Sequence, residues 1–397
     1  MLLIDLTHTS HTRARTGVQR VCRSLYFSGK NRGQLLGCTY DRFAQRWREL
    51  REWENANLVS EAPATKRGAQ WRWSARWRGR LERWTGAANA ALPQVDGLIV
   101  PEIFSAETAQ AFSHLFPQIS GPKVAVFHDA IALKFPELTP AKTVARFPGY
   151  LQELRQFDGV AAVSEDSRQT LLSYWEWLGL KETPIVRTLQ LGAPKPVVRP
   201  PSSRLTSSRM INAIQILCVG SIEGRKNHIA LLDAAETLWE KGLTFQLQLI
   251  GLAHAETGRA ALEKISSLQQ AGRPLQYDGA VDEAALERSY ASCDFTVYPS
   301  LMEGFGLPVL ESIHHGKPCL CSSRGALGEA ARGGGCMTCD PVDAESLARA
   351  MESLINDPVL RKKLADEAAA RPGRGWDDYA DELLAFISEL RREPAKP

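Results

Sequence analysis

Two glutamates, Glu303 and Glu311, combine residue type and spacing in a way that suits ligand binding. They lie in the segment Tyr298–Glu311, where Gly304 and Gly306 precede a proline that favours the first turn of a helix. Carboxylates accept hydrogen bonds from hydroxyl groups, and the amides at the start of a helix bind anions. The segment therefore predicts a site for a sugar or ribose next to a phosphate. The alternative is an ordinary helix start at which Glu311 is only solvated.

The amides expected to face that ligand belong to Phe305, Gly306 and Leu307. A second loop, Gly220–His228, has the adjacent cations Arg225 and Lys226 before a predicted helix. Charge-assisted hydrogen bonds from such a pair can hold a diphosphate. The alternative is a basic surface turn in which Asn227 caps the helix.

The first half of the chain contributes two weaker candidates. His128 and Asp129 follow a predicted strand, where the histidine can bind a sugar or make a local structural hydrogen bond. Gly17 follows the first predicted strand, and its lack of a side chain suits the close approach of a substrate or a simple turn.

Strands that alternate with helices must position these loops. The predicted strands are Leu2–Leu6, Gly97–Val100, Val124–Phe127, Gly159–Val163, Ile214–Val219, Phe245–Ile250, Leu275–Tyr277, Phe295–Tyr298 and Cys319–Cys321. The predicted helices of the second half are His228–Lys241, Thr257–Gln270, Glu283–Ala291, Pro308–His315, Glu345–Ile355, Leu360–Ala370 and Asp377–Arg391. This alternation predicts parallel, doubly wound α/β sheets, whose ligands bind beyond the carboxyl ends of the strands.

The length of the chain predicts two domains. Prolines and serines at Pro194–Ser208 mark a linker, so the expected domains are residues 1–196 and 197–375 on either side of a cleft. Hydrophobic residues make up 44% of the chain and no apolar run is long enough to span a membrane, so we expect a cytoplasmic globular protein.

The eight cysteines are expected to be reduced. The pairs Cys319-x-Cys321 and Cys336-x-x-Cys339 have a spacing that also fits a four-thiolate zinc site. Free cysteines are ordinary small apolar residues when buried, which is the favoured interpretation, and we predict no metal.

The segment 42–84 differs from the rest of the chain. It holds 11 basic and 5 acidic residues and six of the ten tryptophans. If Trp71–Trp84 is helical, Trp73, Trp77, Leu81 and Trp84 share one face beside a stripe of arginines, a pattern typical of helices at membrane surfaces. Contact with a membrane or a lipid diphosphate acceptor, and packing of the indoles on the first domain, are equally supported. The chain shows no nucleic-acid-binding module, so we expect no nucleic acid partner.

Five blocks resemble the retaining glycosyltransferases of family 4, which have the GT-B fold. They are Tyr298–Glu311, Val219–His228, Phe127–Pro136, Phe157–Arg168 and Thr16–Arg20. The resemblance covers nearly the whole chain except the insertion 42–90. It implies a metal-independent hexosyltransferase without a cofactor, in which the donor, with a GDP-sugar favoured, binds the second domain. The first domain would bind a glycan or lipid-linked glycan acceptor.

The same resemblance implies individual roles. Glu311 would bind the donor ribose, and Glu303 with the amides of Gly304–Leu307 would bind the donor sugar. Arg225 and Lys226 would neutralise the diphosphate, His128 would contact the transferred sugar, and Gly17 would line the diphosphate or acceptor side. Trp376 resembles a late tryptophan after which a final helix, within 376–397, returns to the first domain.

One position departs from the pattern of many members of the family. Ser221 follows Gly220 where those members carry an arginine. The pattern with serine resembles a subgroup, often mannosyl or rhamnosyl transferases, that builds bacterial surface polysaccharides or lipopolysaccharides. Membrane contact through 42–84 would place such an enzyme at the inner face of the membrane. Two rival interpretations remain: a non-catalytic GT-B scaffold that binds other transferases, and a GT-B epimerase acting on sugar nucleotides.

Overall fold

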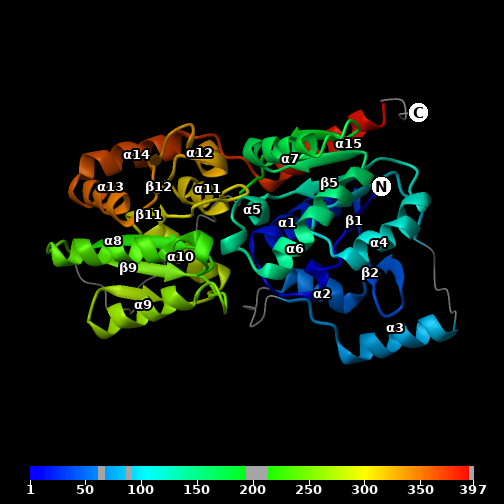
Figure 1. The fold of residues 1–397 in the computed structure, drawn as a ribbon, viewed down its shortest axis with the longest axis horizontal. Coiled ribbons are helices and arrows are strands. Elements are labelled where there is room, and N and C mark those ends of the chain that lie inside the picture. Colours follow the sequence, from blue (N-terminus) through cyan, green and yellow to red (C-terminus); the bar gives the residue numbers. More distant parts are fainter. Residues whose placement is uncertain (61–67, 86–91, 194–212, 393–397) are drawn as a thin grey trace. The chain divides into compact units, whose positions relative to one another are not determined.

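The computed structural model describes residues 1–60, 68–85, 92–193 and 213–392, which form two compact units (Figure 1). Unit 1 comprises Met1–Lys134, Pro140–Gly192 and Arg374–Pro397, and unit 2 comprises Phe135–Thr139 and Ala193–Gly373. The units divide at residue 192, four residues before the predicted boundary. The predicted linker Pro194–Ser208 lies outside the described residues.

Unit 1 is built on a seven-stranded sheet in the order β3-β2-β1-β4-β5-β6-β7. All neighbours pair in parallel except β2 and β3, which are antiparallel. The strands are β1 (Leu2–Asp5), β2 (Leu35–Asp41), β3 (Arg46–Glu49), β4 (Leu98–Val100), β5 (Lys123–Phe127), β6 (Gly159–Ala162) and β7 (Ile185–Thr188). The α-helices are α1 (Gly17–Asn31), α2 (Glu52–Val59), α3 (Trp73–Thr85), α4 (Ala106–Leu115), α5 (Ile131–Lys134), α6 (Ala141–Glu153), α7 (Glu165–Trp177) and α15 (Trp376–Leu390).

Unit 2 is built on a six-stranded parallel sheet in the order β10-β9-β8-β11-β12-β13. Its strands are β8 (Ile214–Val219), β9 (Phe245–Ile250), β10 (Leu275–Tyr277), β11 (Phe295–Tyr298), β12 (Cys319–Ser322) and β13 (Cys336–Cys339). Its α-helices are α8 (His228–Glu240), α9 (Arg259–Gln270), α10 (Glu283–Ser292), α11 (Leu307–His314), α12 (Gly325–Ala331), α13 (Ala344–Asn356) and α14 (Pro358–Ala370). The prediction of doubly wound α/β sheets is confirmed for both units.

Four strands were not anticipated: β2, β3, β7 and β13. β3, β7 and β13 lie at sheet edges, where a strand pairs on one side only and needs no continuous apolar run. β3, for example, contains arginines on both sides of the buried Trp47. β2 lies inside the sheet, but its sequence Leu-Leu-Gly-Cys-Thr-Tyr-Asp is weakened as a strand signal by glycine and aspartate.

The final helix, α15, packs on unit 1. Tyr379, Leu383, Phe386 and Ile387 are buried, and the ring of Phe386 lies close to Gly159 of β6. A Cβ atom at Gly159 would lie 2.8 Å from Cζ of Phe386, so the glycine allows the helix to approach the sheet. Buried apolar area of this kind stabilises by about 25 cal/mol per Å². The structure thus places the last helix on the first unit.

The tryptophan-rich segment divides into two groups. Trp47 is buried in the core of unit 1, where it stacks on Phe112 with ring centroids 5.5 Å apart. Trp71 stacks on the buried His11 at 3.8 Å. The three tryptophans of α3 behave in the opposite way, because all of them are exposed. Packing on the first domain therefore explains Trp47 and Trp71, and it does not explain the three tryptophans of α3.

The two faces of α3 explain this exposure. Ala75 and Gly79 are buried against the turn between β2 and β3, where a Cβ atom at Gly79 would lie 2.8 Å from Cβ of Phe43. Glu82 on the same face is bound by Arg46 and Arg51. The opposite face presents the exposed apolar side chains, which are Trp73, Trp77, Leu81 and Trp84. No helix in the described part of the chain has both the length and the apolar composition needed to cross a bilayer.

Candidate functional site

The candidate site of unit 2 lies where the strand order of its sheet reverses. β8 is the first strand of the unit, and the chain places β9 and β10 on one side of it and β11, β12 and β13 on the other. Ligands of open parallel sheets bind beyond the carboxyl ends of the two strands at this point, here β8 and β11. Two of the loops predicted from sequence, 220–228 and 298–307, follow these two strands.

A buried ion pair joins the two loops. Nζ of Lys226 lies 2.5 Å from Oε1 of Glu303, and Nη1 of Arg225 lies 3.0 Å from Oε2 of the same carboxylate. Lys226 is only 7% exposed and also donates a hydrogen bond to the hydroxyl of Tyr298 at the end of β11. The interpretation of this loop as a basic surface turn is therefore wrong.

Asn227 does not cap the following helix as that alternative required. Its side chain makes no capping hydrogen bond at α8, and Nδ2 instead donates to the carbonyl of Val342 at 2.7 Å. The backbone of Asn227 has φ 55°, in the left-handed region, so the chain turns sharply between Lys226 and α8.

The cations determine the charge of Glu303. Burial alone would raise the pKa of this carboxyl, but Arg225 and Lys226 lower it to about 2. Burial lowers the pKa of Lys226 from its usual value, and Glu303 opposes that change. A carboxylate held beside two cations can accept hydroxyl hydrogen bonds, while the cations can be shared with phosphate oxygens.

Glu311 lies in the second turn of α11 and is only 3% exposed, so the interpretation that it is merely solvated is wrong. Its Oε2 accepts a hydrogen bond from the hydroxyl of Tyr290 at 3.0 Å. Tyr290 in turn stacks on His315, with centroids 4.7 Å apart, which fixes the orientation of its ring. The carboxylate is therefore held in one position by its neighbours.

The turn before α11 has the geometry expected of an anion-binding helix start. Gly306 caps the helix with φ 97°, a conformation that favours glycine, and Leu307 and Pro308 form the first helical positions. Gly304 and Phe305 precede this cap in the loop that also contains Glu303. The amides of this turn and the positive end of α11 are thus placed beside the ion pair.

Ser221, the position at which this chain departs from the pattern of the family it resembles, follows Gly220 just after β8. Its Oγ donates a hydrogen bond to Oε1 of Glu223 at 2.9 Å. Glu223 also lies 2.8 Å from Nη2 of Arg225, so the serine is connected to the cation through one carboxylate. Ser221 adds no charge to the site, and within this loop the positive charge comes from Arg225 and Lys226.

His128 belongs to unit 1, at the end of β5, and is buried. Its Nε2 lies 2.7 Å from the carbonyl of Pro101, which can only accept, so Nε2 carries the proton. Burial lowers the pKa of the imidazole, which leaves Nδ1 of the neutral ring as an acceptor. The structural hydrogen bond weighed from sequence is present, and it orients the ring without using Nδ1.

Gly17 is the first residue of α1 in unit 1, after the extended Thr16. A Cβ atom at this position would have nothing within 4 Å. Packing within the protein therefore gives no reason for a glycine here. Approach of a ligand remains a prediction.

Sequence reasoning missed the tyrosines of the site. Tyr298 binds Lys226, and Tyr290 binds Glu311, although Tyr290 and Glu311 lie 21 residues apart. Tyr298 ends a predicted strand beside a predicted ligand loop, a signal that was present in the sequence. Tyr290 has no comparable signal, because only the packing of α10 on α11 brings it to Glu311.

Three of the four cysteines considered as a zinc site come together. The sulfur atoms of Cys319, Cys321 and Cys336 lie within 4.8 Å of one another on β12 and β13. Cys339 does not belong to this group, since β13 places it opposite Ser322. Cys319 and Cys321 are buried beside Tyr298, Val309 and Ile313. The absence of a bound metal stays a prediction.

The sequence comparisons point to one class of protein. Residues 210–371 match the family described as "Glycosyl transferases group 1". The "Serotype-specific mannosyltransferase WbdA" of Escherichia coli is 24% identical over 335 residues, which cover 80% of this chain and 38% of that protein. The "O-antigen chain mannosyltransferase B" of Escherichia coli is 29% identical over 273 residues, or 66% of this chain and 68% of that protein. The chain thus spans about two fifths of WbdA.

The comparison with solved structures concerns the fold. Anabaena Alr3699/HepE, solved in complex with UDP-glucose, superposes with a TM-score of 0.70 at 14% identity, covering 98% of this chain and 99% of that one. The fold of the chain is therefore GT-B, and the residues matched by the family contain the candidate site of unit 2.

Proposed function

We propose that this chain, which resembles bacterial polysaccharide mannosyltransferases and carries a group 1 glycosyltransferase domain in unit 2, is a retaining hexosyltransferase. It transfers mannose from a nucleoside diphosphate to a hydroxyl group of a growing surface polysaccharide. The observation that carries this proposal is the buried network of Arg225, Lys226 and Glu303 at the point where the strand order of unit 2 reverses.

The network suits the departure of a diphosphate. As the bond between the sugar and the phosphate breaks, negative charge develops on the phosphate oxygens, where Arg225 and Lys226 stabilise it. Glu303 keeps both cations in place before the donor binds and then accepts hydrogen bonds from sugar hydroxyls. Glu311, held by Tyr290, accepts hydrogen bonds from the ribose.

The acceptor hydroxyl attacks from the face of the departing phosphate, which retains the configuration of the sugar and needs no covalent intermediate. The phosphate oxygen takes the proton of the attacking hydroxyl. His128 contributes Nδ1 as an acceptor for a hydroxyl of the transferred sugar. We propose that no metal ion takes part, because two fixed cations and the start of α11 supply positive charge.

A thermal-shift screen tests the donor. GDP-mannose should raise the unfolding temperature of the wild-type protein more than UDP-, ADP- or dTDP-sugars do, because a ligand that binds only the folded state stabilises it. The rise should disappear in Glu311→Ala and remain in Glu345→Ala, a control at a glutamate whose side chain is 81% exposed in the same unit. No rise with any nucleotide sugar would contradict the proposal and favour a scaffold.

We also propose that the enzyme works in the cytoplasm, attached to the inner face of the membrane through α3. Its apolar ridge consists of Trp73, Trp77, Leu81 and Trp84, of which Trp84 is 85% exposed. Arg72, Arg76, Arg80 and Arg83 lie beside this ridge and are exposed as well. Tryptophans favour the membrane interface, and each basic side chain near an anionic bilayer adds about 1 kcal/mol of attraction.

Cosedimentation with liposomes tests this attachment. The wild-type protein should bind vesicles that contain phosphatidylglycerol and should not bind pure phosphatidylcholine. The triple variant Trp73→Ser, Trp77→Ser and Trp84→Ser should lose binding, while Trp177→Ser should keep it. Trp177 is a matched control because it is 79% exposed on α7 of the same unit. Equal binding by the triple variant would exclude membrane contact through α3.

A further inference from the structure

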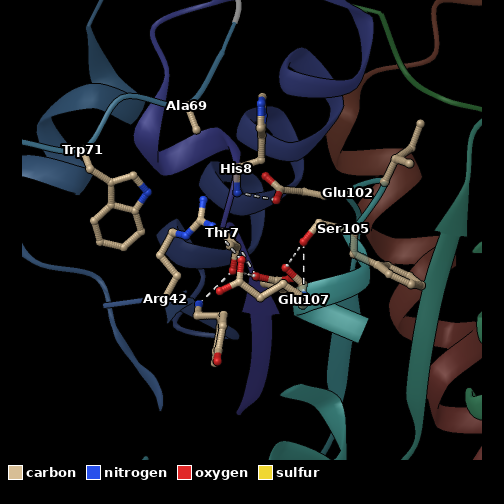
Figure 2. Close-up of a pocket in the computed structure, with 13 residues that line it drawn as sticks. Thr7, His8, Arg42, Ala69, Trp71, Glu102, Ser105 and Glu107 are labelled. Atoms are coloured by element: carbon tan, nitrogen blue, oxygen red, sulfur yellow. Dashed lines mark hydrogen bonds and ion pairs between the residues drawn. The ribbon is translucent and has the colours of Figure 1, made fainter. Parts of the chain in front are cut away.

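Unit 1 contains a pocket at the position that corresponds to the candidate site of unit 2 (Figure 2). Its strand order reverses between β1 and β4, as that of unit 2 reverses between β8 and β11. The pocket lies beyond the carboxyl ends of β1, β2 and β4 and has a cavity volume of about 200 Å³, open to solvent. This volume is below the ~300–1,000 Å³ of sites for drug-sized ligands, so the pocket suits one small ring.

Two buried carboxyl groups form the floor of the pocket. Asp5, at the end of β1, is fully buried, and Oδ1 accepts hydrogen bonds from the amide of Thr7 at 2.9 Å and its hydroxyl at 2.6 Å. Oδ2 of Asp5 has no hydrogen-bond partner in the described part of the chain. A buried polar atom without a partner carries a free-energy cost, which a ligand in the pocket can relieve.

Glu102 is the second carboxyl group of the floor and is buried after β4. It accepts a hydrogen bond from the backbone amide of His8 (Figure 2) and another from that of Thr9, both at 2.6 Å, which holds the loop after β1 in place. Burial, and then the nearby Glu102, raise the pKa of Asp5 to about 8. An anionic ligand would face these carboxyl groups, so the floor favours a neutral, hydroxyl-rich molecule.

An aromatic wall stands on the other side of the pocket. Trp71 stacks on His11 at 3.8 Å and meets Phe43 edge-on at 5.3 Å, so its indole is held in one orientation. Figure 2 shows the indole among the side chains that line the pocket. Arg42 and Glu107 form an ion pair of 3.0 Å at the same pocket. Carboxyl groups with a fixed aromatic face are a suitable combination for a sugar ring, which has both hydroxyl groups and an apolar C–H face.

We propose that this pocket binds a neutral hexose ring of the acceptor glycan, with Trp71 against the face of the ring and Asp5 against its hydroxyls. The inference rests on the proposed function, because it assigns the acceptor sugar of that reaction to unit 1. The insertion that distinguishes this chain then has two roles: α3 presents the exposed ridge, and Trp71 completes a sugar site.

Saturation-transfer NMR with methyl α-mannoside and α-linked mannotriose tests the proposal without any donor. The wild-type protein and Trp84→Ala should give sugar signals of equal strength. Trp71→Ala should weaken them at least fivefold. Glucuronic acid should bind less well than the neutral sugars. Signals of wild-type strength in Trp71→Ala, or no signal with the wild-type protein, would overturn the assignment.

A second variant guards against unfolding of Trp71→Ala, since Trp71 packs on His11. Ile103 lines the pocket and is 45% exposed, so Ile103→Arg fills the pocket without removing a buried contact. It should abolish mannotriose binding at an unchanged unfolding temperature, and unchanged binding would overturn the proposal. The thermal shift with GDP-mannose should persist in both variants. If GDP-mannose gives no thermal shift with the wild-type protein, the proposed donor is wrong. Binding of mannotriose would still test the pocket of unit 1 independently of the donor.

Discussion

Glu303 in unit 2 and Asp5 in unit 1 are both buried carboxyl groups at a reversal of strand order, yet their pKa values move in opposite directions. Against the effect of burial, Arg225 and Lys226 lower the pKa of Glu303 to about 2. Burial and Glu102 raise the pKa of Asp5 to about 8. The same fold position therefore supplies a fixed anion among cations in one unit and a carboxyl group that resists ionisation in the other.

The difference agrees with the division of a transfer reaction proposed above. In that proposal the cations of unit 2 stabilise a charged leaving group, and the carboxyl groups and the indole of unit 1 bind a neutral sugar. In both units the fold puts a carboxyl group at the reversal of strand order. The charged neighbours of that carboxyl group then determine whether a charged or a neutral ligand fits there.

The largest effect is expected from Glu303→Gln, which removes the anion between two cations. Loss of one partner of a buried ion pair lowers the free energy of unfolding by roughly 3–5 kcal/mol. The folded pKa is about 2 and the ordinary value is 4.5, so the contribution is present above pH 4.5 and is lost as the pH falls through about 2. Urea unfolding at pH 7, 5 and 3 measures the difference between variant and wild type. A difference that stays constant down to pH 3 would contradict this account, and Glu345→Gln serves as the control.

Lys226→Ala is expected to lower turnover by roughly two orders of magnitude or more, the usual loss when one charge-stabilising donor is removed. In the variant, Arg225 is the one remaining cation of the pair beside Glu303. With fewer positive charges nearby, the surroundings of Glu303 become more like those of Asp5. Steady-state transfer of mannose measures the effect. Lys241→Ala is the matched control, because Lys241 is an exposed lysine of the same unit. Wild-type turnover in Lys226→Ala would remove the residue from the mechanism.

Asp5→Asn tests the other side of the comparison. A carboxyl group whose folded pKa is raised to about 8 destabilises the protein increasingly as the pH rises from about 4 to 8. The variant should therefore unfold at a higher temperature than the wild type at pH 8, by about 4 °C or more, and the gain should shrink at pH 5. Scanning calorimetry at the two pH values measures it, with the exposed Glu176→Gln as control. A gain that is equal at both pH values would indicate that Asp5 does not titrate in this range.

The smallest effect concerns Gly17, the one candidate in unit 1 that was predicted to approach the diphosphate. Because a Cβ atom there meets nothing within 4 Å, Gly17→Ala should leave the unfolding temperature unchanged. Turnover should fall severalfold if the helix start approaches a ligand. In contrast, Gly79→Ala should destabilise α3, since its Cβ would lie 2.8 Å from Cβ of Phe43. Full activity in Gly17→Ala would assign the diphosphate to unit 2 alone.

Most of unit 2 was predictable from sequence, although β13 and α12 were missed. The bounds of β8, β9, β10 and β11 equal those predicted, because each is a short segment rich in apolar residues between clear helices. In unit 1 the prediction missed β2, β3 and β7, where polar residues, glycine or an edge position hide the pattern. The periodicity of a segment predicts the strands and helices that its own sequence favours. It does not predict edge strands, because these form through pairing with strands elsewhere in the chain.

The candidate sites divide in the same way. Arg225, Lys226 and Glu303 could be proposed from sequence because charged residues cluster in loops after strands. Asp5 and Trp71 could not, because the first looks like the end of a core strand and the second gains its role by stacking on His11, 60 residues earlier. Contacts between distant segments supply the properties that residue type alone does not predict.

The position of α15 affects the order in which the protein can fold on the ribosome. Unit 1 is complete only when residues 376–390 have been made, after roughly 180 residues of unit 2. At about 5–20 residues per second, this interval lasts on the order of 10–40 s. During that time the surface of β6 at Gly159, which Phe386 covers in the finished protein, is open to water and to other chains. We therefore expect unit 2 to fold first. We also expect chaperones to bind the incomplete first unit before α15 has been made.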